Sequence, residues 1–273
     1  MVIGYAGENR YMKIISITGS ARKNGNTRRI AEQLCREINS IADANSIRAE
    51  FEQINLSDME IKICKGCRVC FDKGEELCPL KDDLLTLRDK INQADGIILS
   101  SPIYVEDING IMKNWIDRMA FLCHRPAFFG KAAVIIATSG GGASNHALKT
   151  MKSAVLAWGF HVCAQGKFRT GVFMEASKME ACFGNQIKAA AKQLFSALSN
   201  KSRNPSFYSL MVFKIQQKYR QKTKSLYNTF DYTWWKEKGW LENTRSYYTP
   251  HNSGFIKVKL ARLAGSVVSK FFL

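Results

Sequence analysis

The stretch Ser16-Ile17-Thr18-Gly19-Ser20-Ala21-Arg22-Lys23-Asn24-Gly25-Asn26-Thr27-Arg28 decides how this chain folds. An apolar run over residues 13–18 predicts a buried strand, and the apolar spacing over residues 27–34 predicts a helix. A turn rich in Gly, Ser and Asn between a strand and a helix forms an anion site, because free backbone N–H groups and the positive end of the helix dipole point into it. The stretch therefore predicts a phosphate-binding loop.

The turn does not match the loops that bind nucleoside triphosphates or dinucleotides. Counting from Gly19, Asn24 occupies the second Gly position of the triphosphate loop and Gly25 occupies its Lys position. The dinucleotide fingerprint fails because Ala21 and Asn24 occupy its second and third Gly positions. What remains is a hydroxyl- and amide-rich turn suited to one phosphate monoester without a metal. The alternative is an ordinary strand-to-helix turn in which Asn26 caps the helix.

Two later segments repeat this pattern. Residues 94–104 predict a buried strand that ends in Ser101-Pro102-Ile103-Tyr104, and residues 109–118 predict the helix after it. Residues 132–138 predict a third buried strand, followed by Ser139-Gly140-Gly141-Gly142 and a helix over about residues 144–158. Ligands of open parallel α/β sheets bind outside the carboxyl ends of the strands. The three segments therefore predict one shared ligand crevice.

Together the three segments resemble the flavodoxin-like NAD(P)H-dependent FMN reductase family, over about residues 12–165. The resemblance implies an α/β, three-layer flavodoxin-like fold with a five-stranded parallel sheet. It implies FMN as cofactor, NAD(P)H as co-substrate, a small-molecule or protein electron acceptor, and a homodimer or larger oligomer. It implies no catalytic side chain, because the flavin carries the chemistry.

The resemblance also assigns the FMN-binding residues position by position. For Tyr104, a simple packing role is the alternative. The resemblance implies that Ser20, Arg22, Asn26 and Thr27 bind the FMN phosphate. It implies that one side of the flavin ring contacts Ser101, Pro102, Ile103 and Tyr104, and that the other side contacts Ser139, Gly140 and Gly141.

Four of the eight cysteines, Cys64, Cys67, Cys70 and Cys78, form a C-x2-C-x2-C-x7-C cluster. Such a cluster fits a reducing compartment better than a secreted disulfide scaffold. Four thiolates at these separations can surround an iron–sulfur cluster or a tetrahedral zinc ion. The run resembles the motif of iron–sulfur flavoproteins, a branch of the same family, which implies a 4Fe-4S cluster. Zinc and free or redox-active thiols stay open as alternatives.

Composition places these motifs in a chain of 273 residues with 46% hydrophobic content, enough for one α/β domain and an appendage. We expect the flavodoxin-like domain over residues 12–199 and a basic, aromatic-rich helical extension over residues 200–273. Residues 1–10 contain no long apolar run, and no stretch approaches the roughly 20 apolar residues of a membrane span. These observations predict a cytoplasmic protein.

The excess of positive charge lies in the C-terminal part. Residues 166–273 hold 19 Lys and Arg against 5 Asp and Glu, whereas residues 1–165 hold 21 against 18. A basic tail is typical of nucleic-acid binding, but no zinc-finger, RNP-type or helix-turn-helix signature accompanies it, so we expect no nucleic-acid partner.

Apolar stripes in the tail predict amphipathic helices. They can cover the domain or a partner subunit, or they can contact an anionic membrane surface peripherally. A Trp-rich segment ending in Gly239-Trp240 is similar to extensions in this family and favours packing. The stripes are Tyr208, Met211, Val212, Ile215 and Tyr219 within residues 207–228, and Ile256, Leu260, Leu263, Val267 and Phe271 within residues 254–272.

We therefore expect an FMN-dependent NAD(P)H oxidoreductase that transfers a hydride to flavin and passes electrons to an acceptor that the sequence does not name. One alternative is an iron–sulfur flavoprotein that carries electrons without nicotinamide. Another is a flavin-binding sensor or scaffold whose tail is the working part.

Overall fold

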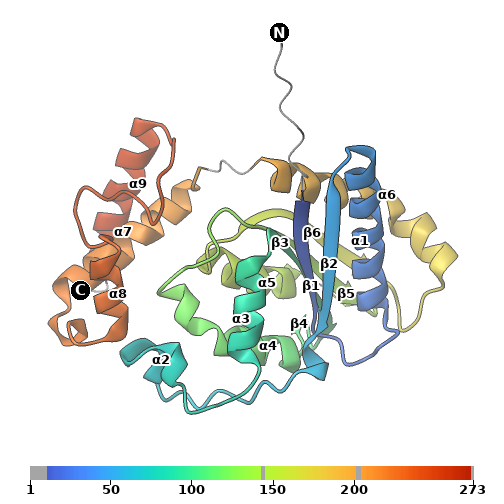
Figure 1. Ribbon diagram of the computed structural model, residues 1–273, viewed down its shortest axis with the longest axis horizontal. Coiled ribbons are helices and arrows are strands. Elements are labelled where there is room, and N and C mark those ends of the chain that lie inside the picture. Colours follow the sequence, from blue (N-terminus) through green and yellow to red (C-terminus); the bar gives the residue numbers. More distant parts are fainter. Residues whose placement is uncertain (1–10, 143–144, 201–203, 272–273) are drawn as a thin grey trace, which may run out of the picture.

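The computed structural model describes residues 11–142, 145–200 and 204–271. A sheet runs through the centre of the molecule with the strand order β2-β1-β3-β5-β6 (Figure 1). These five strands pair in parallel, as expected. They are β1 (Tyr11–Thr18), β2 (Arg48–Asn55), β3 (Gly96–Tyr104), β5 (Ala132–Ser139) and β6 (His161–Arg169).

Within the described ranges the sheet has six strands, so the expectation of five was wrong by one. The additional strand, β4 (Asp107–Ile108), folds back on the end of β3 and pairs with it antiparallel. Val105 and Glu106 form the turn between them with φ values of 50° and 67°, the positive signs that a tight two-residue hairpin turn requires. A two-residue strand has no periodicity that a sequence pattern could reveal.

Helices cover both faces of the sheet and make three layers. The central strands β1, β3 and β5 are largely buried on both faces, which explains why each of them reads as a continuous apolar run, whereas the edge strands β2 and β6 are partly exposed. Ile14, Ile98 and Val134 pack under one helical layer, and Ile15, Ile97 and Ile135 pack under the other. The first layer holds α1 (Asn26–Ala44) and α6 (Ala176–Ser199), and the second holds α3 (Leu84–Gln93), α4 (Gly110–Arg118) and α5 (Asn145–Ala157) (Figure 1).

Two expected helix boundaries differ in the structure. Gly25 is the N-cap of α1, and Asn26 is its first helical residue, so the reading of Asn26 as the cap was wrong. The helix predicted over residues 207–228 ends at Lys222 and is followed by a short 3-10 turn, Lys224–Leu226. Residue 144, where we expected the helix that is now α5 to begin, lies outside the described residues.

The C-terminal extension lies on the opposite side of the molecule from α1 (Figure 1). It contains α7 (Phe207–Lys222), α8 (Phe230–Glu237) and α9 (Phe255–Val268). Trp235 and Trp240 are buried with Phe213 in a hydrophobic cluster of the extension, and the Trp235 indole donates to the His124 carbonyl at 2.7 Å. The Trp-rich segment therefore packs as expected.

The domain boundary at residues 199 and 200 stays a prediction, because residues 201–203 lie outside the described part. No helix among the described residues has the length and apolar character needed to cross a membrane. The remaining short elements are α2 (Val69–Asp72) and the 3-10 turns Leu56–Asp58, Glu75–Leu77, Ala120–Cys123 and Ser269–Phe271.

Candidate functional site

The structure brings the three predicted segments together at the carboxyl ends of β1, β3 and β5, which are neighbours in the sheet. The Gly19 N–H donates to the Ser100 carbonyl at 2.9 Å, and the Asn109 side-chain amide donates to the Gly19 carbonyl. The hydroxyls of Thr27 and Thr138 are 2.6 Å apart and hydrogen bonded. This hydrogen bond joins α1, which follows the first segment, to β5, which precedes the third segment.

The residues predicted to hold a phosphate surround the start of α1. The side chains of Ser20 and Thr27 are buried, and Arg22 is exposed. The Ser20 hydroxyl accepts the Arg22 N–H at 3.2 Å, which folds the turn over the helix N-terminus. The turn thus holds two hydroxyls beside the free N–H groups of α1, with a guanidinium able to reach over them.

Asn26 has a role that sequence patterns did not indicate. Its side-chain amide faces the carbonyls of Gly171 and Val172 at 3.4 and 3.5 Å, and its oxygen accepts the Met174 N–H at 3.3 Å. It therefore anchors the loop after β6 against the phosphate turn. Nothing in the local sequence could reveal this, because the partners lie about 145 residues away.

The residues predicted to hold the flavin ring flank the same edge. The four residues of the second segment belong to β3 itself, because Ser101 and Pro102 pair with β5 and pairing with β4 extends the strand through Ile103 and Tyr104. Ser101 is buried, whereas Tyr104 is exposed and so does not serve as a packing residue of this domain. Tyr104 is therefore free to contact a ligand at this edge.

The third segment has the features that best fit a bound ligand. Ser139 ends β5 with a buried hydroxyl that has no hydrogen-bond partner among the described residues. Beyond it, Gly140 and Gly141 are exposed, and, chain neighbours aside, no atom of the described residues lies within 4 Å of the position that a Cβ would occupy at either residue. A buried hydroxyl without a partner is disfavoured unless a ligand or water completes it. This edge therefore fits a planar, polar ring, as FMN has.

Asn109 is a site residue that the sequence analysis missed. Its side-chain oxygen accepts the Met112 N–H at 3.2 Å and so caps α4, while its amide binds the phosphate turn at the Gly19 carbonyl. The Asn at the start of a predicted helix was an available signal for the cap. The second contact, across 90 residues, had none.

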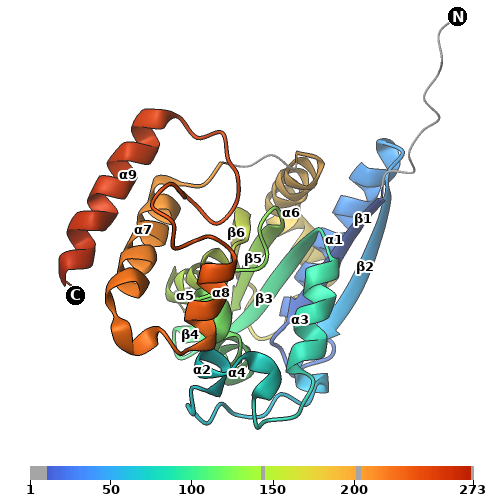
Figure 2. The ribbon, with the colours of Figure 1, turned by 60° about the vertical axis from the view of Figure 1, so that its left-hand side comes forward.

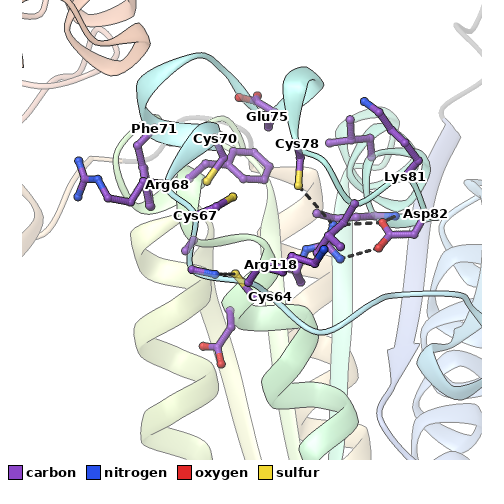
Figure 3. A pocket seen from close by; sticks show the side chains of 18 residues that line it. Cys64, Cys67, Arg68, Cys70, Phe71, Glu75, Cys78, Lys81, Asp82 and Arg118 are labelled. Carbon is purple, nitrogen blue, oxygen red and sulfur yellow. Dashed lines mark hydrogen bonds and ion pairs between the residues drawn. The ribbon is translucent and has the colours of Figure 1, made fainter.

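The four clustered cysteines line one cavity of about 190 Å³ (Figure 3). Cys64 and Cys67 are exposed, whereas Cys70 and Cys78 are partly buried. Burial raises the pKa of the Cys70 thiol, and although Arg125 opposes this, the neighbouring Cys78 and Cys64 raise it further. The thiols are therefore close enough to influence one another.

A buried ion pair fixes the cysteine segment to the second helical layer. Arg118, at the end of α4, pairs with Asp82, and their side chains are 3% and 1% exposed. Burial disfavours the Asp82 carboxylate, yet hydrogen bonds from Arg118 and from the backbone hold its pKa below the ordinary value. Arg118 also donates to the Lys62 carbonyl at 2.7 Å and lies 3.9 Å from the Cys78 sulfur. The residues that flank the cysteine segment, Lys62 and Asp82, are thus both bound by the Arg118 side chain.

A second polar network joins the cysteine segment to the C-terminal extension. The buried Arg125 guanidinium pairs with Glu75 in the segment and with Asp231 in α8. His124 Nδ1 lies 2.5 Å from the other oxygen of Asp231. Burial and three nearby guanidinium groups, with that of Arg220 the strongest, lower the pKa of His124 to about 4. A cavity of about 540 Å³, lined in part by His124 and Arg220, lies beside this network.

The four thiols at the cysteine cavity are a donor set that an iron–sulfur cluster or a zinc ion can use. Within residues 11–142, 145–200 and 204–271, no three His, Cys, Asp or Glu residues are arranged to hold one metal ion. One zinc ion needs its sulfur ligands within about 2.3 Å of a single point. A cluster of several irons joins thiolates that are farther apart, and four soft thiols around one cavity are its preferred ligands. The residues present therefore fit an iron–sulfur cluster.

A parallel sheet with ligand segments at the carboxyl ends of its central strands defines a flavodoxin-like α/β protein. Residues 12–173, more than half of the chain, match the family described as NADPH-dependent FMN reductase, so the chain belongs to that family. The flavodoxin-like fold that the sequence predicted is confirmed, with six strands in place of five.

Curated relatives carry the name iron–sulfur flavoprotein. One from Archaeoglobus fulgidus is 29% identical over 239 residues, which are 84% of this chain and 100% of that protein. One from Methanocaldococcus jannaschii is 39% identical over 107 residues, which are 39% of this chain and 51% of that protein. A solved oxidoreductase from Corynebacterium diphtheriae has a TM-score of 0.53 and 17% identity, over 70% of this chain and 98% of that chain. This last likeness shows the fold alone.

Proposed function

We propose that this protein is an FMN-dependent NAD(P)H oxidoreductase that passes electrons to an acceptor. The observation that carries the proposal is the buried Ser139 hydroxyl, which has no hydrogen-bond partner among the described residues and lies at the sheet edge where the phosphate turn also lies. Membership of the FMN reductase family supports it.

Each segment of the site has its own role in this proposal. FMN, when bound, supplies the hydride chemistry. Ser20, Thr27 and the N–H groups of α1 bind the phosphate, with Arg22 over it. The end of β3 holds one side of the ring, and the third segment holds the other, where the Ser139 hydroxyl gains a partner. Asn26 and Asn109 keep the loops in place.

Flavin titration of the purified protein tests this proposal. Hydrogen bonds to a charged group contribute about 1.5–3 kcal/mol each. Ser20→Ala combined with Thr27→Ala should therefore weaken FMN binding at least about a hundredfold, measured by quenching of flavin fluorescence. NADH and NADPH oxidation should fall in parallel at limiting FMN.

Thr86→Ala combined with Ser153→Ala is the matched control, because both hydroxyls are exposed on helices outside the site. It should bind FMN like the unaltered protein. Unchanged FMN affinity in the Ser20 and Thr27 double variant would remove the phosphate turn from the site.

A second candidate function is that of an iron–sulfur flavoprotein, in which a 4Fe-4S cluster on the four cysteines exchanges electrons with the flavin. The shared cavity of the cysteines favours it, and so do the names of the curated relatives. Asn109 caps the start of α4 and Arg118 ends it, so the two candidate sites lie at opposite ends of this nine-residue helix. At 1.5 Å per residue this helix is about 14 Å long.

Anaerobic reconstitution followed by iron and acid-labile sulfide analysis tests the cluster. We expect about four irons and four sulfides per chain, and a loss of both in Cys67→Ser. Cys182→Ser, at an exposed cysteine on α6, is the control and should keep them. Fewer than about two irons, with no change in Cys67→Ser, would leave the cysteines as thiols; zinc without sulfide would indicate a structural metal instead.

A further inference from the structure

Helix α9 leaves an apolar face uncovered. Ala261, Gly265 and Ser269 are buried on one side of the helix, toward α7. Of the three alternatives that the sequence left open, the stripe of α9 therefore does not cover the protein's own surface, while a partner subunit and an anionic membrane surface stay open. Figure 2 shows α9 at the outer edge of the molecule, beyond α7. The uncovered residues, 50% to 82% exposed, are Ile256, Leu260, Leu263, Val267 and Phe271.

The packing of α9 keeps this face turned outward. A Cβ on Gly265 would lie 2.7 Å from the Met211 carbonyl oxygen and 2.8 Å from the Cβ of Lys214, so the close approach of the two helices at this point requires glycine. Lys257 donates to the Pro205 carbonyl and Arg262 to the Asn243 carbonyl, at 2.8 and 2.7 Å. These contacts fix the rotation of α9 about its axis, so the stripe cannot turn inward without breaking them.

The charge around the stripe indicates which kind of surface can bind to it. Helices α7 and α9 together contain no Asp or Glu and seven Lys and Arg residues, and all of these except the buried Lys214 and Arg220 reach the surface. Lys259 and Lys270 are exposed on the same side of the helix as the stripe. A second copy packed face to face would bring two such basic surfaces together, which like-charge repulsion opposes. An anionic surface is complementary to both the apolar and the basic residues.

We propose that α9 docks flat on an anionic lipid surface. The stripe enters the boundary between headgroups and acyl chains, and Lys259 and Lys270 contact the headgroups. The absence of a membrane-crossing helix in the described part of the chain agrees with a helix that lies on the bilayer. The site is separate from the cofactor segments, so the proposal does not depend on the proposed function.

Vesicle co-sedimentation of the full chain tests the proposal. We expect binding to phosphatidylcholine vesicles that contain about one quarter phosphatidylglycerol, and weak binding to phosphatidylcholine alone. Leu260→Ser combined with Leu263→Ser should reduce binding to the anionic vesicles at least about tenfold, because two buried apolar side chains are lost. Leu156→Ser makes the same change at an exposed position of α5 and should bind normally.

A charge variant separates lipid binding from other causes. Lys259→Gln combined with Lys270→Gln should weaken binding to the anionic vesicles and reduce its dependence on salt. Circular dichroism should show the same helix content in all variants, since every altered side chain is exposed. Equal binding to both vesicle types, or no binding, would overturn the proposal. A dimer in light scattering that becomes a monomer in the Leu260 and Leu263 variant would also overturn it, because a second copy would then cover the stripe.

Discussion

At the scale of single residues, the Ser139 hydroxyl allows a role in stabilising the fold to be distinguished from a role in binding the ligand. A side chain that stabilises the fold has a partner within the fold, and this buried hydroxyl has none in the part of the chain that the structure describes. Ser139→Ala should therefore leave the free energy of unfolding of the FMN-free protein unchanged or raise it by up to about 1 kcal/mol. FMN affinity should fall about tenfold or more, because the bound flavin loses a hydrogen bond.

Urea unfolding of the FMN-free protein and fluorescence titration with FMN measure the two quantities separately. Ser153→Ala, at an exposed position of α5, should change neither of them. Destabilisation by more than about 1 kcal/mol with unchanged FMN affinity would show that the hydroxyl serves the fold.

At the scale of elements, the turn between β3 and β4 holds strain next to the ring-binding residues. Val105 and Glu106 both have positive φ, and Val105 is β-branched and 98% exposed, so no packing repays this conformation. A left-handed residue other than glycine costs about 1–2 kcal/mol. Val105→Asn combined with Glu106→Gly, the residues that such turns favour, should raise the free energy of unfolding by about 1–2 kcal/mol.

Urea unfolding measures this gain. The same two residue types introduced at exposed helical positions, Thr86→Asn in α3 with Ser153→Gly in α5, should lower stability instead. If NADH or NADPH oxidation by the FMN-loaded variant falls while its stability rises, the strain of the turn serves the adjacent site. No gain in stability would mean that the turn carries no strain.

The elements also show what a sequence pattern can and cannot predict. The three central strands were predictable because burial on both faces leaves continuous apolar runs, whereas the partly exposed edge strands β2 and β6 contain no such run. The buried face of α7 was not, because it includes Lys214, Gln217 and Arg220, whereas Tyr208 of the predicted stripe is exposed. Gln217 donates to the carbonyls of Trp240 and Glu242, and Arg220 lies over the Trp235 ring. Polar residues become core residues there only because partners distant in sequence satisfy them.

The same distinction holds for the candidate site. The phosphate turn and the cysteine motif were predictable because each one is contiguous in sequence. The Arg118–Asp82 pair and the contacts of Asn26 and Asn109 were not, because each of them joins segments that only the fold brings together.

At the scale of the whole molecule, one polar network connects the α/β domain, the cysteine segment and the extension. Asp231 accepts contacts from Arg125, His124 and, at 4.0 Å, Arg220, while Arg125 also holds Glu75. Loss of one partner would leave buried charges uncompensated. The position of the extension therefore depends on the protonation of this network.

The homodimer, the cytoplasmic location and the absence of a nucleic-acid partner stay predictions.

Acid should weaken this connection through His124. The unfolded chain binds a proton at His124 near pH 6.5, whereas burial and the charges of Arg220, Arg125 and Arg68 lower the pKa in the folded protein to about 4. Below pH 6.5 the unfolded state holds more protons at this site, so its contribution to stability, complete above pH 6.5, is lost as the pH falls toward 4. Melting curves followed by tryptophan fluorescence should show a smaller loss between pH 7 and about 5 in His124→Gln than in the unaltered protein, by a few degrees. His146→Gln, at an exposed histidine, is the control and should follow the unaltered protein. Equal acid sensitivity of all three proteins would assign the effect to carboxylates elsewhere.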